Sequence, residues 1–302
     1  MSTSMRTAAV LCSHNGASFI AEQLDSIATQ KLPVDEIHVF DWNSTDGTAD
    51  IVRDRMQGSG SLHLACRSNA PGAGRSFLSA LTEVASNTSA DLIFIADQDD
   101  AWTANKAEVM VESFLGAQFD LAFSDVSIVD EGGKLLAPSF YASRSPYSKP
   151  RSETEDALLL TNPAIGMTMC VRKDWLVTLA PALEQDWRMH DWALCILCHL
   201  TRGRLRYIDR PLVRYRQHGG NLLGAAQTRS HLGRLLRLRG HVDNIRRQFD
   251  CVRRSSEDLG LDKRGEELLV LVSGRVRQAK LAWTPLLRPG YRAALAAAML
   301  LL

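Results

Sequence analysis

The sequence lacks the features that mark several specialised classes of protein. Its apolar runs all fall short of the ~18 residues that a membrane-spanning helix requires. The start of the chain has no long apolar stretch of the kind found in a signal peptide, so we expect a cytoplasmic protein. The formal net charge of the 302 residues is only +1, which excludes the strongly basic balance of a general nucleic-acid binder. No nucleic-acid partner is therefore expected.

A disulfide framework is also lacking, because the six cysteines are scattered along the chain and most lie within apolar stretches. One pair, Cys195 and Cys198, has the spacing of a redox or zinc motif and is followed by His199. The apolar residues around this pair nevertheless favour a buried helix. Internal repeats and low-complexity tracts are absent as well, so the composition indicates a globular protein with room for a large core.

What the sequence does contain is a repeated alternation of strand and helix patterns. Buried strands are predicted where short apolar runs end in turn residues, at residues 7–12, 36–40, 62–66 and 91–96. Helical spacing of apolar residues follows each of them, at residues 17–30, 49–56, 75–85 and 102–114. Such units with short links predict an α/β fold with a mostly parallel sheet and helices on both faces.

Beyond residue 114 the pattern becomes less regular. Further strands are predicted at residues 119–126, 166–171, 205–209 and 213–216, with a helix at residues 191–200. The stretch 130–134 has the composition of a hairpin turn. Residues 138–150 are rich in Ser, Tyr, Pro and Arg, and we expect them to form a mobile loop near the site. After about residue 222 the sequence predicts helices with basic faces.

Three carboxylates, Asp97, Asp99 and Asp100, follow directly on the apolar run at residues 92–96. In parallel sheets, ligands bind at the carboxyl ends of such strands. Because side chains alternate along an extended chain, Asp97 and Asp99 should point the same way. Oxygen ligands suit Mg²⁺ or Mn²⁺ better than zinc, and Mg²⁺ held by few carboxylates usually binds substrate phosphates. The cluster predicts a cation site and a phosphorylated substrate; an acidic helix N-terminus is the alternative.

Four motifs occur in order between about residues 7 and 224. They are Val10-Leu11-Cys12-Ser13-His14-Asn15-Gly16, Asp41 to Thr48, Asp97-Gln98-Asp99-Asp100-Ala101-Trp102, and His190-Asp191-Trp192 with Tyr215 to Asn221. Together they resemble the inverting family 2 glycosyltransferases of the GT-A fold, and among these the bacterial rhamnosyltransferase-like members. Any one motif is weak evidence, but the ordered set is specific.

The resemblance implies a GT-A type nucleotide-diphospho-sugar transferase fold over residues 1–224. It leaves residues 225–302 as a C-terminal basic helical region. The implied activity is an inverting transfer that depends on Mg²⁺ or Mn²⁺ and uses a dTDP- or UDP-linked sugar, with a deoxyhexose such as rhamnose favoured. The acceptor would be a hydroxyl of a glycan or lipid-linked glycan in cell-surface polysaccharide synthesis.

The resemblance also implies roles for individual residues. Asp99 would hold the cation that bridges the diphosphate, and Asp97 would face the ribose or help to hold the metal. His218 would contact the metal or the diphosphate, unless it is a solvent-facing loop residue. The residues expected to line the nucleotide pocket or to approach the nucleotide are Ser13, His14, Asn15, Asp41, Trp42 and Arg75.

Asp191 is the predicted catalytic base. Inversion by direct displacement requires one carboxylate to take the proton of the acceptor hydroxyl as it attacks the anomeric carbon. The start of an apolar helix would keep Asp191 ionised through the positive end of the helix dipole, although a plain helix cap would occupy the same position. Trp192 would either form a platform for the bound sugar or pack in the core.

The chain departs from the family pattern in the predicted base pocket. Trp42 and Asn43 stand where family members usually carry a second Asp and often Gly, and His14 replaces the usual Tyr. A Trp could stack on a nucleobase, but a carboxylate that accepts hydrogen bonds is lost. Two rival functions therefore stay open: a non-catalytic relative that binds glycan or acts as a scaffold, and a sugar-phosphate nucleotidyltransferase. The second would usually show a Gly-rich basic loop after the first strand, which is absent here.

The region after residue 225 lies outside the motifs. Leucines and arginines interleave over residues 232–239, as on a basic amphipathic helix, and residues 293–302 are almost wholly apolar. Peripheral contact with the inner face of a membrane would suit an enzyme that acts on a lipid-linked glycan. Helices packed on the catalytic domain, with their arginines in water, are the alternative.

Overall fold

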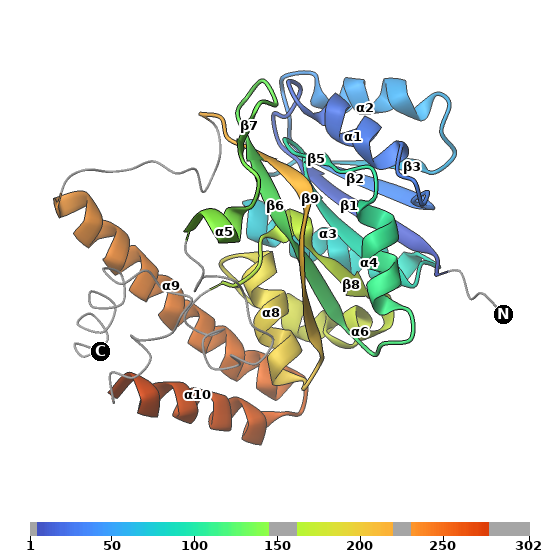
Figure 1. Ribbon diagram of the computed structural model, residues 1–302. Helices are drawn as coiled ribbons and strands as arrows, with labels where there is room; N and C mark the ends of the chain where they lie inside the picture. Colours follow the sequence, from blue (N-terminus) through green and yellow to red (C-terminus); the bar gives the residue numbers. More distant parts are fainter. Residues whose placement is uncertain (1–4, 145–161, 220–230, 278–302) are drawn as a thin grey trace.

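The computed structural model describes residues 5–144, 162–219 and 231–277. Its described part is built around one 9-stranded sheet with the strand order β3-β2-β1-β4-β8-β6-β9-β5, and β7 pairs with β6 (Figure 1). The strands are β1 Thr7–Ser13, β2 Glu36–Trp42, β3 Leu62–Arg67, β4 Leu92–Asp97, β5 Ala101–Trp102, β6 Leu121–Val129, β7 Leu135–Ala137, β8 Cys170–Arg172 and β9 Leu205–Arg216.

The first half of the sheet is parallel, as the alternation of strands and helices predicts. β1 pairs in parallel with β2 and β4, and β2 pairs in parallel with β3. The residues of β1 are all buried and β4 is buried along its apolar run, because helices cover both faces of these strands. The helices between them are α1 Ile20–Ala28, α2 Thr48–Met56 and α3 Ala73–Asn87.

The second half of the sheet is mixed. β8 pairs antiparallel with β4 and β6, β6 pairs in parallel with β9, and β9 pairs antiparallel with β5. The two short strands predicted at residues 205–209 and 213–216 are one strand, β9. Its pairing with β6 shifts in register around Pro211, which has no N–H to donate to a ladder. Because Pro211 interrupts the strand pattern in the sequence, two separate strands were predicted where the structure has one.

Three other elements differ from the sequence prediction. The helix expected from residue 102 begins at Lys106 as α4 Lys106–Phe114, because β5 pairs with β9. The strand expected at residues 166–171 is a 3₁₀ turn, η2 Gly166–Thr168, followed by β8. The expected loop at residues 138–150 begins with the short helix α5 Phe140–Arg144, and its remainder lies outside the described residues.

Apolar side chains form one cluster on each face of the sheet. Alternate residues of β1 separate into the two clusters, with Val10 on one face and Leu11 on the other. Leu11 packs with residues of α1, α2 and α4, whereas Val10 packs with residues of the helices α3, α6 Lys173–Thr178, α7 Ala180–Leu183 and α8 His190–Leu200. The prediction of helices on both faces is therefore confirmed.

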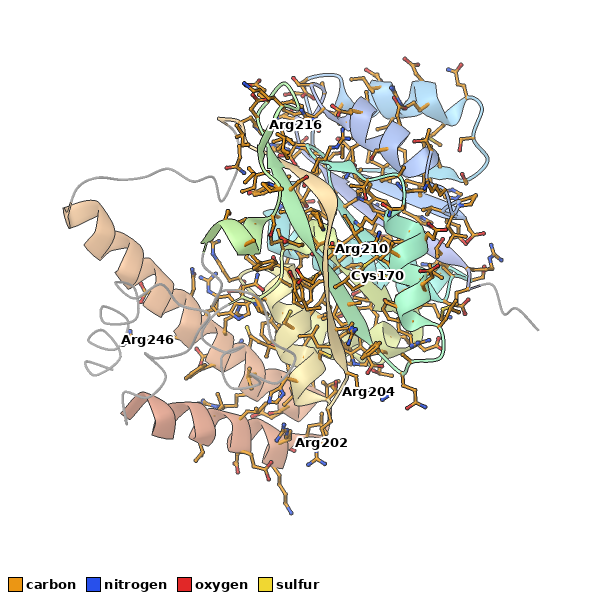
Figure 2. All side chains as sticks on the ribbon, in the orientation of Figure 1. Cys170, Arg202, Arg204, Arg210, Arg216 and Arg246 are labelled. Atoms are coloured by element: carbon orange, nitrogen blue, oxygen red, sulfur yellow. The ribbon has the colours of Figure 1, made fainter. Side chains whose placement is uncertain are left out.

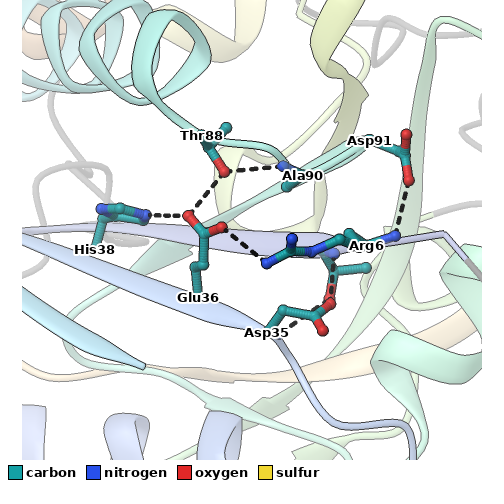
Figure 3. Close-up of polar contacts among 8 residues, drawn as sticks. Arg6, Asp35, Glu36, His38, Thr88, Ala90 and Asp91 are labelled. Atoms are coloured by element: carbon teal, nitrogen blue, oxygen red, sulfur yellow. Dashed lines mark hydrogen bonds and ion pairs between the residues drawn. The ribbon is translucent and has the colours of Figure 1, made fainter. Parts of the chain in front are cut away.

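A polar network joins the amino ends of β1, β2 and β4, at the edge of the sheet opposite to their carboxyl ends (Figure 3). Glu36 accepts a hydrogen bond from Thr88 Oγ1 at 2.8 Å and pairs with His38 at 3.0 Å and Arg6 at 3.6 Å. The backbone N–H of Arg6 donates to Asp91 Oδ2 at 2.8 Å. These contacts fix the register of three strands without occupying the edge where their carboxyl ends meet.

The C-terminal helices α9 His231–Asp258 and α10 Asp262–Arg277 lie beside α8, on the side of the molecule away from β3 (Figure 1). Cys251, Val252 and Leu268 join the same apolar cluster as α8, so α9 and α10 pack on the face of the sheet that α8 covers. Side chains at residues 232–239 and the apolar stretch 293–302 lie outside the described residues. Within the described ranges, no helix is both long enough and apolar enough to cross a membrane.

Candidate active site

A cavity of about 440 Å³ lies at the carboxyl ends of β1, β2 and β4. The start of α3, η2 and the start of α8 complete its wall. Six residues that the sequence singled out line it, namely Ser13, His14, Trp42, Asp97, Asp99 and Asp191. Segments that are more than 170 residues apart in the chain, from Ser13 to Asp191, therefore meet in one cavity. This is the position where open parallel sheets bind ligands.

The acidic cluster after β4 contains three carboxylates whose oxygens lie within 4.8 Å of one another. Burial and the charges of Asp99 and Asp191 raise the pKa of Asp97 to about 8. Burial and the neighbouring Asp97 and Asp99 raise the pKa of Asp100 well above its ordinary value. Oδ2 of Asp100 is buried without a hydrogen-bond partner among the described residues. Carboxylates that repel one another in this way fit a divalent cation such as Mg²⁺ or Mn²⁺.

Lys106, the first residue of α4, is fully buried and interacts electrostatically with Asp97 and Asp100 of this cluster. Its ammonium group donates to the Met167 carbonyl at 2.7 Å and lies 3.7 Å from the centre of the Trp102 ring. Burial lowers the pKa of Lys106 to about 7, and the charges of Asp100 and Asp97 act in the opposite direction. The sequence did not single out this residue, because a lysine at the start of a helix usually faces solvent.

Arg216 fixes the loop that carries the cluster. Its backbone N–H donates to Asp100 Oδ1 at 2.9 Å, and its Nε donates to the Asp99 carbonyl at 3.0 Å. The same guanidinium donates to the Glu131 carbonyl at 2.7 Å and pairs with Glu22 at 2.6 Å. Figure 2 labels Arg216 at the end of β9, beside the β6–β7 hairpin. One buried side chain thus joins α1, the hairpin and the acidic loop.

His218, two residues further on, lies next to the cluster as the resemblance implied. Its Nε2 is 2.8 Å from Asp99 Oδ2, and its ring lies 4.8 Å from the ring of Phe19. The side chain is only 13% exposed, so His218 is not a solvent-facing loop residue. Its place beside Asp99 is therefore suitable for contact with a metal or a diphosphate.

The turn after β1 is held by the loop after β2. Ser13 Oγ donates to Asp41 Oδ1 at 3.0 Å, and Asp41 also accepts a hydrogen bond from Ser44 N at 3.1 Å. Asn15 has a positive φ of 50°, and its side-chain oxygen accepts a hydrogen bond from Thr45 N at 2.9 Å. Asp41 and Asn15 thus hold in place the loops that form the cavity wall, but their own atoms do not line the cavity.

Gln98 connects the same turn to the acidic loop. The N–H of His14 donates to Gln98 Oε1 at 2.9 Å, and Gln98 Nε2 donates to the His14 carbonyl at 3.1 Å. A side chain at Gly16 would collide with the Gln98 amide, so the close approach requires glycine there. Gln98 stood within a quoted motif but was not predicted as a site residue. A glutamine between two aspartates does not reveal in the sequence that its side chain binds the backbone of His14.

Asp191 lies in the first turn of α8 and is 5% exposed. It lines the cavity together with Asp97, and its charge contributes to the raised pKa of Asp97. Its Oδ1 accepts a hydrogen bond from the N–H of Trp192 at 2.7 Å. A buried carboxylate at a helix N-terminus, facing the same cavity as a cation site, can accept a proton from a bound hydroxyl.

Besides Asp41 and Asn15, two more predicted binding residues do not line the cavity. Trp192 is 5% exposed and packs in the apolar cluster below α8, because its position in the helix points it toward the core. Arg75 is exposed on α3, and its guanidinium donates to the Glu184 carbonyl at 2.9 Å. For these two residues, contact with a bound nucleotide-sugar stays a prediction that would need a side-chain movement.

Several other residues line the cavity for which the sequence predicted no role in the site, although Tyr215 and His190 stand within the fourth motif. Tyr215 lies at the end of β9, and His190 lies directly before Asp191. Apolar side chains make up another part of the lining: Phe77, Ile165, Met167 and Met189. Apolar residues in a buried segment give no sign of whether they face a core or a cavity, so only the fold could reveal them.

The fold resembles solved structures of nucleotide-sugar enzymes. Staphylococcus aureus TarS 1–349 in complex with UDP-GlcNAc matches with a TM-score of 0.58 and 15% sequence identity, over 98% of this chain and 88% of that one. The mannosyltransferase PcManGT from Pyrobaculum calidifontis, in complex with GDP-Man and Mn²⁺, matches with a TM-score of 0.56 and 17% identity, over 99% and 88% of the two chains. At these identities the comparison establishes the fold, a GT-A type.

Sequence comparison identifies the family. The dTDP-rhamnosyl transferase RfbG of Shigella flexneri is 28% identical to this chain over 224 residues, which cover 71% of this chain and 74% of the relative. The model of the family described as glycosyl transferase family 2 matches residues 8–176, more than half of the chain. These residues include β1, the loop after β2 and the acidic cluster after β4. The chain is a glycosyltransferase and belongs to glycosyl transferase family 2.

Proposed function

We propose that this protein is a metal-dependent inverting glycosyltransferase that transfers a deoxyhexose from a dTDP- or UDP-linked donor to a glycan or lipid-linked glycan. The observation that carries the proposal is that Asp97 and Asp99, two members of the carboxylate cluster, line the same cavity as Asp191. A cation site and a separate carboxylate base are the two functions that such a transfer requires.

The nucleotide would occupy the part of the cavity near β1 and β2. Ser13, His14 and Trp42 line it there, and Asp41 and Asn15 hold their loops in position. The indole of Trp42 is 6% exposed, so a base that stacks on it would meet only an edge or one face of the ring. Because Trp42 occupies the position of a usual carboxylate, we propose both dTDP- and UDP-linked donors.

The metal would be held by Asp99 and Asp97, with His218 and Asp100 next to them. When bound, a divalent cation stabilises the negative charge that develops on a departing nucleoside diphosphate. The protein's part is to hold these carboxylates close together. The hydrogen bonds from Arg216 to Asp100 and to the Asp99 carbonyl do so.

Asp191 would act as the general base. It accepts the proton of the acceptor hydroxyl while the hydroxyl oxygen forms a bond to the anomeric carbon and the bond from that carbon to the diphosphate breaks. The attack comes from the face opposite to the diphosphate, so the configuration is inverted. A single carboxylate is sufficient, because no covalent intermediate with the enzyme forms.

A deoxyhexose is supported by two observations. Phe77, Ile165, Met167 and Met189 give part of the cavity an apolar wall, which suits a methyl group better than a hydroxymethyl group. The relative RfbG is named a dTDP-rhamnosyl transferase. We further propose a cytoplasmic enzyme of cell-surface polysaccharide synthesis whose catalytic domain spans residues 1–224. Within the C-terminal region 225–302, α9 packs on α7 and α8, and α10 packs on α8.

The substitution Asp191→Asn tests the proposal. It keeps the size of the side chain and removes the base, so sugar transfer should fall by about 10²-fold or more while donor binding stays within a few-fold of wild type. Transfer is measured with dTDP-rhamnose and UDP-sugars in the presence of Mn²⁺, and binding by calorimetry. Asp174→Asn is the matched control, because its side chain is 85% exposed and is not part of the cavity lining.

The same experiment addresses a second candidate function. A non-catalytic protein that binds glycan is favoured only by Trp42, which replaces a usual carboxylate of the base pocket. If wild type turns over no donor and Asp191→Asn changes nothing, the transferase proposal is wrong and the binding function replaces it.

A further inference from the structure

His190 is a buried polar residue that the reaction proposed above does not use. Its side chain is 3% exposed, and it lines the cavity beside Asp191. Neither Nδ1 nor Nε2 has a hydrogen-bond partner among the described residues. A buried polar group without a partner costs free energy in the unliganded protein. Such a cost at the wall of a cavity suggests that a ligand supplies the missing partner.

The surroundings hold the imidazole ring in one place. It packs on the ring of Phe77, with centroids 4.2 Å apart and an interplanar angle of 31°. On another side it lies against Gly166, where any side chain would collide with Nε2. The Met189 carbonyl meanwhile accepts the helical hydrogen bond from Ala193, so the backbone at this point belongs to the first turn of α8. The ring is thus confined between α3, η2 and α8.

The protonation state defines the ligand chemistry. Burial lowers the pKa of His190, although the neighbouring Asp191 opposes this effect, so the ring is neutral near pH 7. A neutral imidazole carries one N–H donor and one nitrogen acceptor. A hydroxyl group, which donates and accepts, can satisfy either nitrogen. A phosphate oxygen can satisfy only the donor, and it would add charge beside Asp191.

We propose that His190 binds a hydroxyl of the transferred sugar and so determines which donor sugars are accepted. This inference rests on the proposed function, because it requires a nucleotide-sugar in the cavity. The donor sugar is a better partner than the acceptor: His190 is almost wholly enclosed, and an acceptor must enter from solvent to reach Asp191. The residue thus acts in specificity rather than in proton transfer.

The experiment compares nucleoside diphosphate with nucleotide-sugar. Calorimetry measures the binding of dTDP, dTDP-rhamnose, UDP and a UDP-sugar to wild type, His190→Phe and His190→Gln, with Mn²⁺ present. We expect His190→Phe to bind the diphosphate as wild type does and to lose about tenfold or more in affinity for the sugar-linked form. His190→Gln retains a donor and an acceptor, and it should restore part of the loss. His199→Phe, on the same helix and outside the cavity lining, is the matched control.

A second measurement separates a binding role from a structural one. Phe fills the site of the imidazole without an orphaned polar atom, so unliganded His190→Phe should unfold at the same or a higher temperature than wild type. If His190 instead stabilises the fold, unliganded His190→Phe should unfold at a lower temperature than wild type. If His190→Phe does not fold, His190→Leu and a donor that lacks one sugar hydroxyl repeat the test. Wild type should then bind the deoxygenated donor more weakly than the intact donor. His190→Leu should bind the two donors with equal affinity.

The outcomes distinguish this inference from the function on which it rests. Unchanged affinity of His190→Phe for the nucleotide-sugar, or an equal loss for diphosphate and nucleotide-sugar, overturns the role of His190 and leaves the transferase function intact. Failure of wild type to bind any nucleotide overturns both.

Discussion

Asp97 and Asp99 hold their carboxylates in a position where both cannot be charged without a cost. Burial and nearby carboxylates raise the pKa of Asp97 to about 8, so in the metal-free protein this group is largely protonated at pH 7. A cation that binds there must displace the proton. The affinity for metal at this position would thus be linked to pH through the carboxyl group of Asp97.

The affinity for Mn²⁺ should therefore increase with pH. We expect about a tenfold rise in the association constant per pH unit between pH 6 and pH 7, with levelling above pH 8, if one proton is released. Calorimetry in buffers of different ionisation enthalpy measures both the affinity and the protons released. In the control Asp97→Asn the affinity is lower and its dependence on pH is shallower. An affinity of wild type that is constant from pH 6 to pH 8 would mean that Asp97 is not a ligand.

Among individual residues, the sequence predicted several that lie together in the structure, but it did not predict how they are paired. Asp97, Asp99, Asp191 and His218 were predicted and lie together. Lys106, Gln98 and Arg216 were missed, because each acts through a contact with a distant part of the chain. Arg216, for example, reaches Glu22 across 194 residues. A pattern of neighbouring residues cannot report such a contact.

At the scale of elements, the packing of α3 against the segment before α8 positions the candidate base. A Cβ atom added at Gly74 would lie 2.7 Å from the carbonyl oxygen of Arg188, which is backbone and cannot rotate away. Gly74 is buried in the first turn of α3. Its lack of a side chain lets α3 approach the chain that leads into His190 and Asp191.

The substitution Gly74→Ala should consequently destabilise the protein. Alanine favours helix by up to about 1 kcal/mol, but the collision with Arg188 costs about 1–3 kcal/mol and moves the start of α8. Denaturant unfolding measures the stability, and sugar transfer should fall together with it. Gly60→Ala is the control, since nothing lies within 4 Å of its added Cβ. Equal stability of Gly74→Ala and Gly60→Ala would contradict this packing.

The predictability of the elements followed their pattern of burial. β1, β2, β3 and β4 were predicted nearly to the residue, since buried apolar runs bounded by turns identify them. β5 and the continuity of β9 were missed, because two residues are too few for a pattern and Pro211 interrupts the longer strand. Pairing between strands in the mixed half depends on long-range contacts and has no local signal.

At the scale of the whole molecule, the two halves of the sheet have different tasks. The parallel half provides the carboxyl edge on which the nucleotide is expected to lie, and the mixed half supplies Arg216, Tyr215 and His218 from the end of β9. The site exists only where the two halves meet. The helices α9 and α10 pack on α8, which favours the packed alternative for the part of the C-terminal region that the structure describes.

The cavity is expected to bind a nucleotide through a cation held by Asp99. Calorimetry of dTDP, UDP and GDP with wild type and Asp99→Ala, each with and without Mn²⁺, measures this binding. Asp50→Ala is the matched control, because its side chain is 77% exposed and outside the cavity lining. We predict that wild type binds one of these nucleotides tightly only with Mn²⁺, and that Asp99→Ala weakens this binding by about 10-fold or more. Binding that is independent of both Mn²⁺ and Asp99, or no nucleotide binding at all, would show that the cavity is not a metal-dependent nucleotide site.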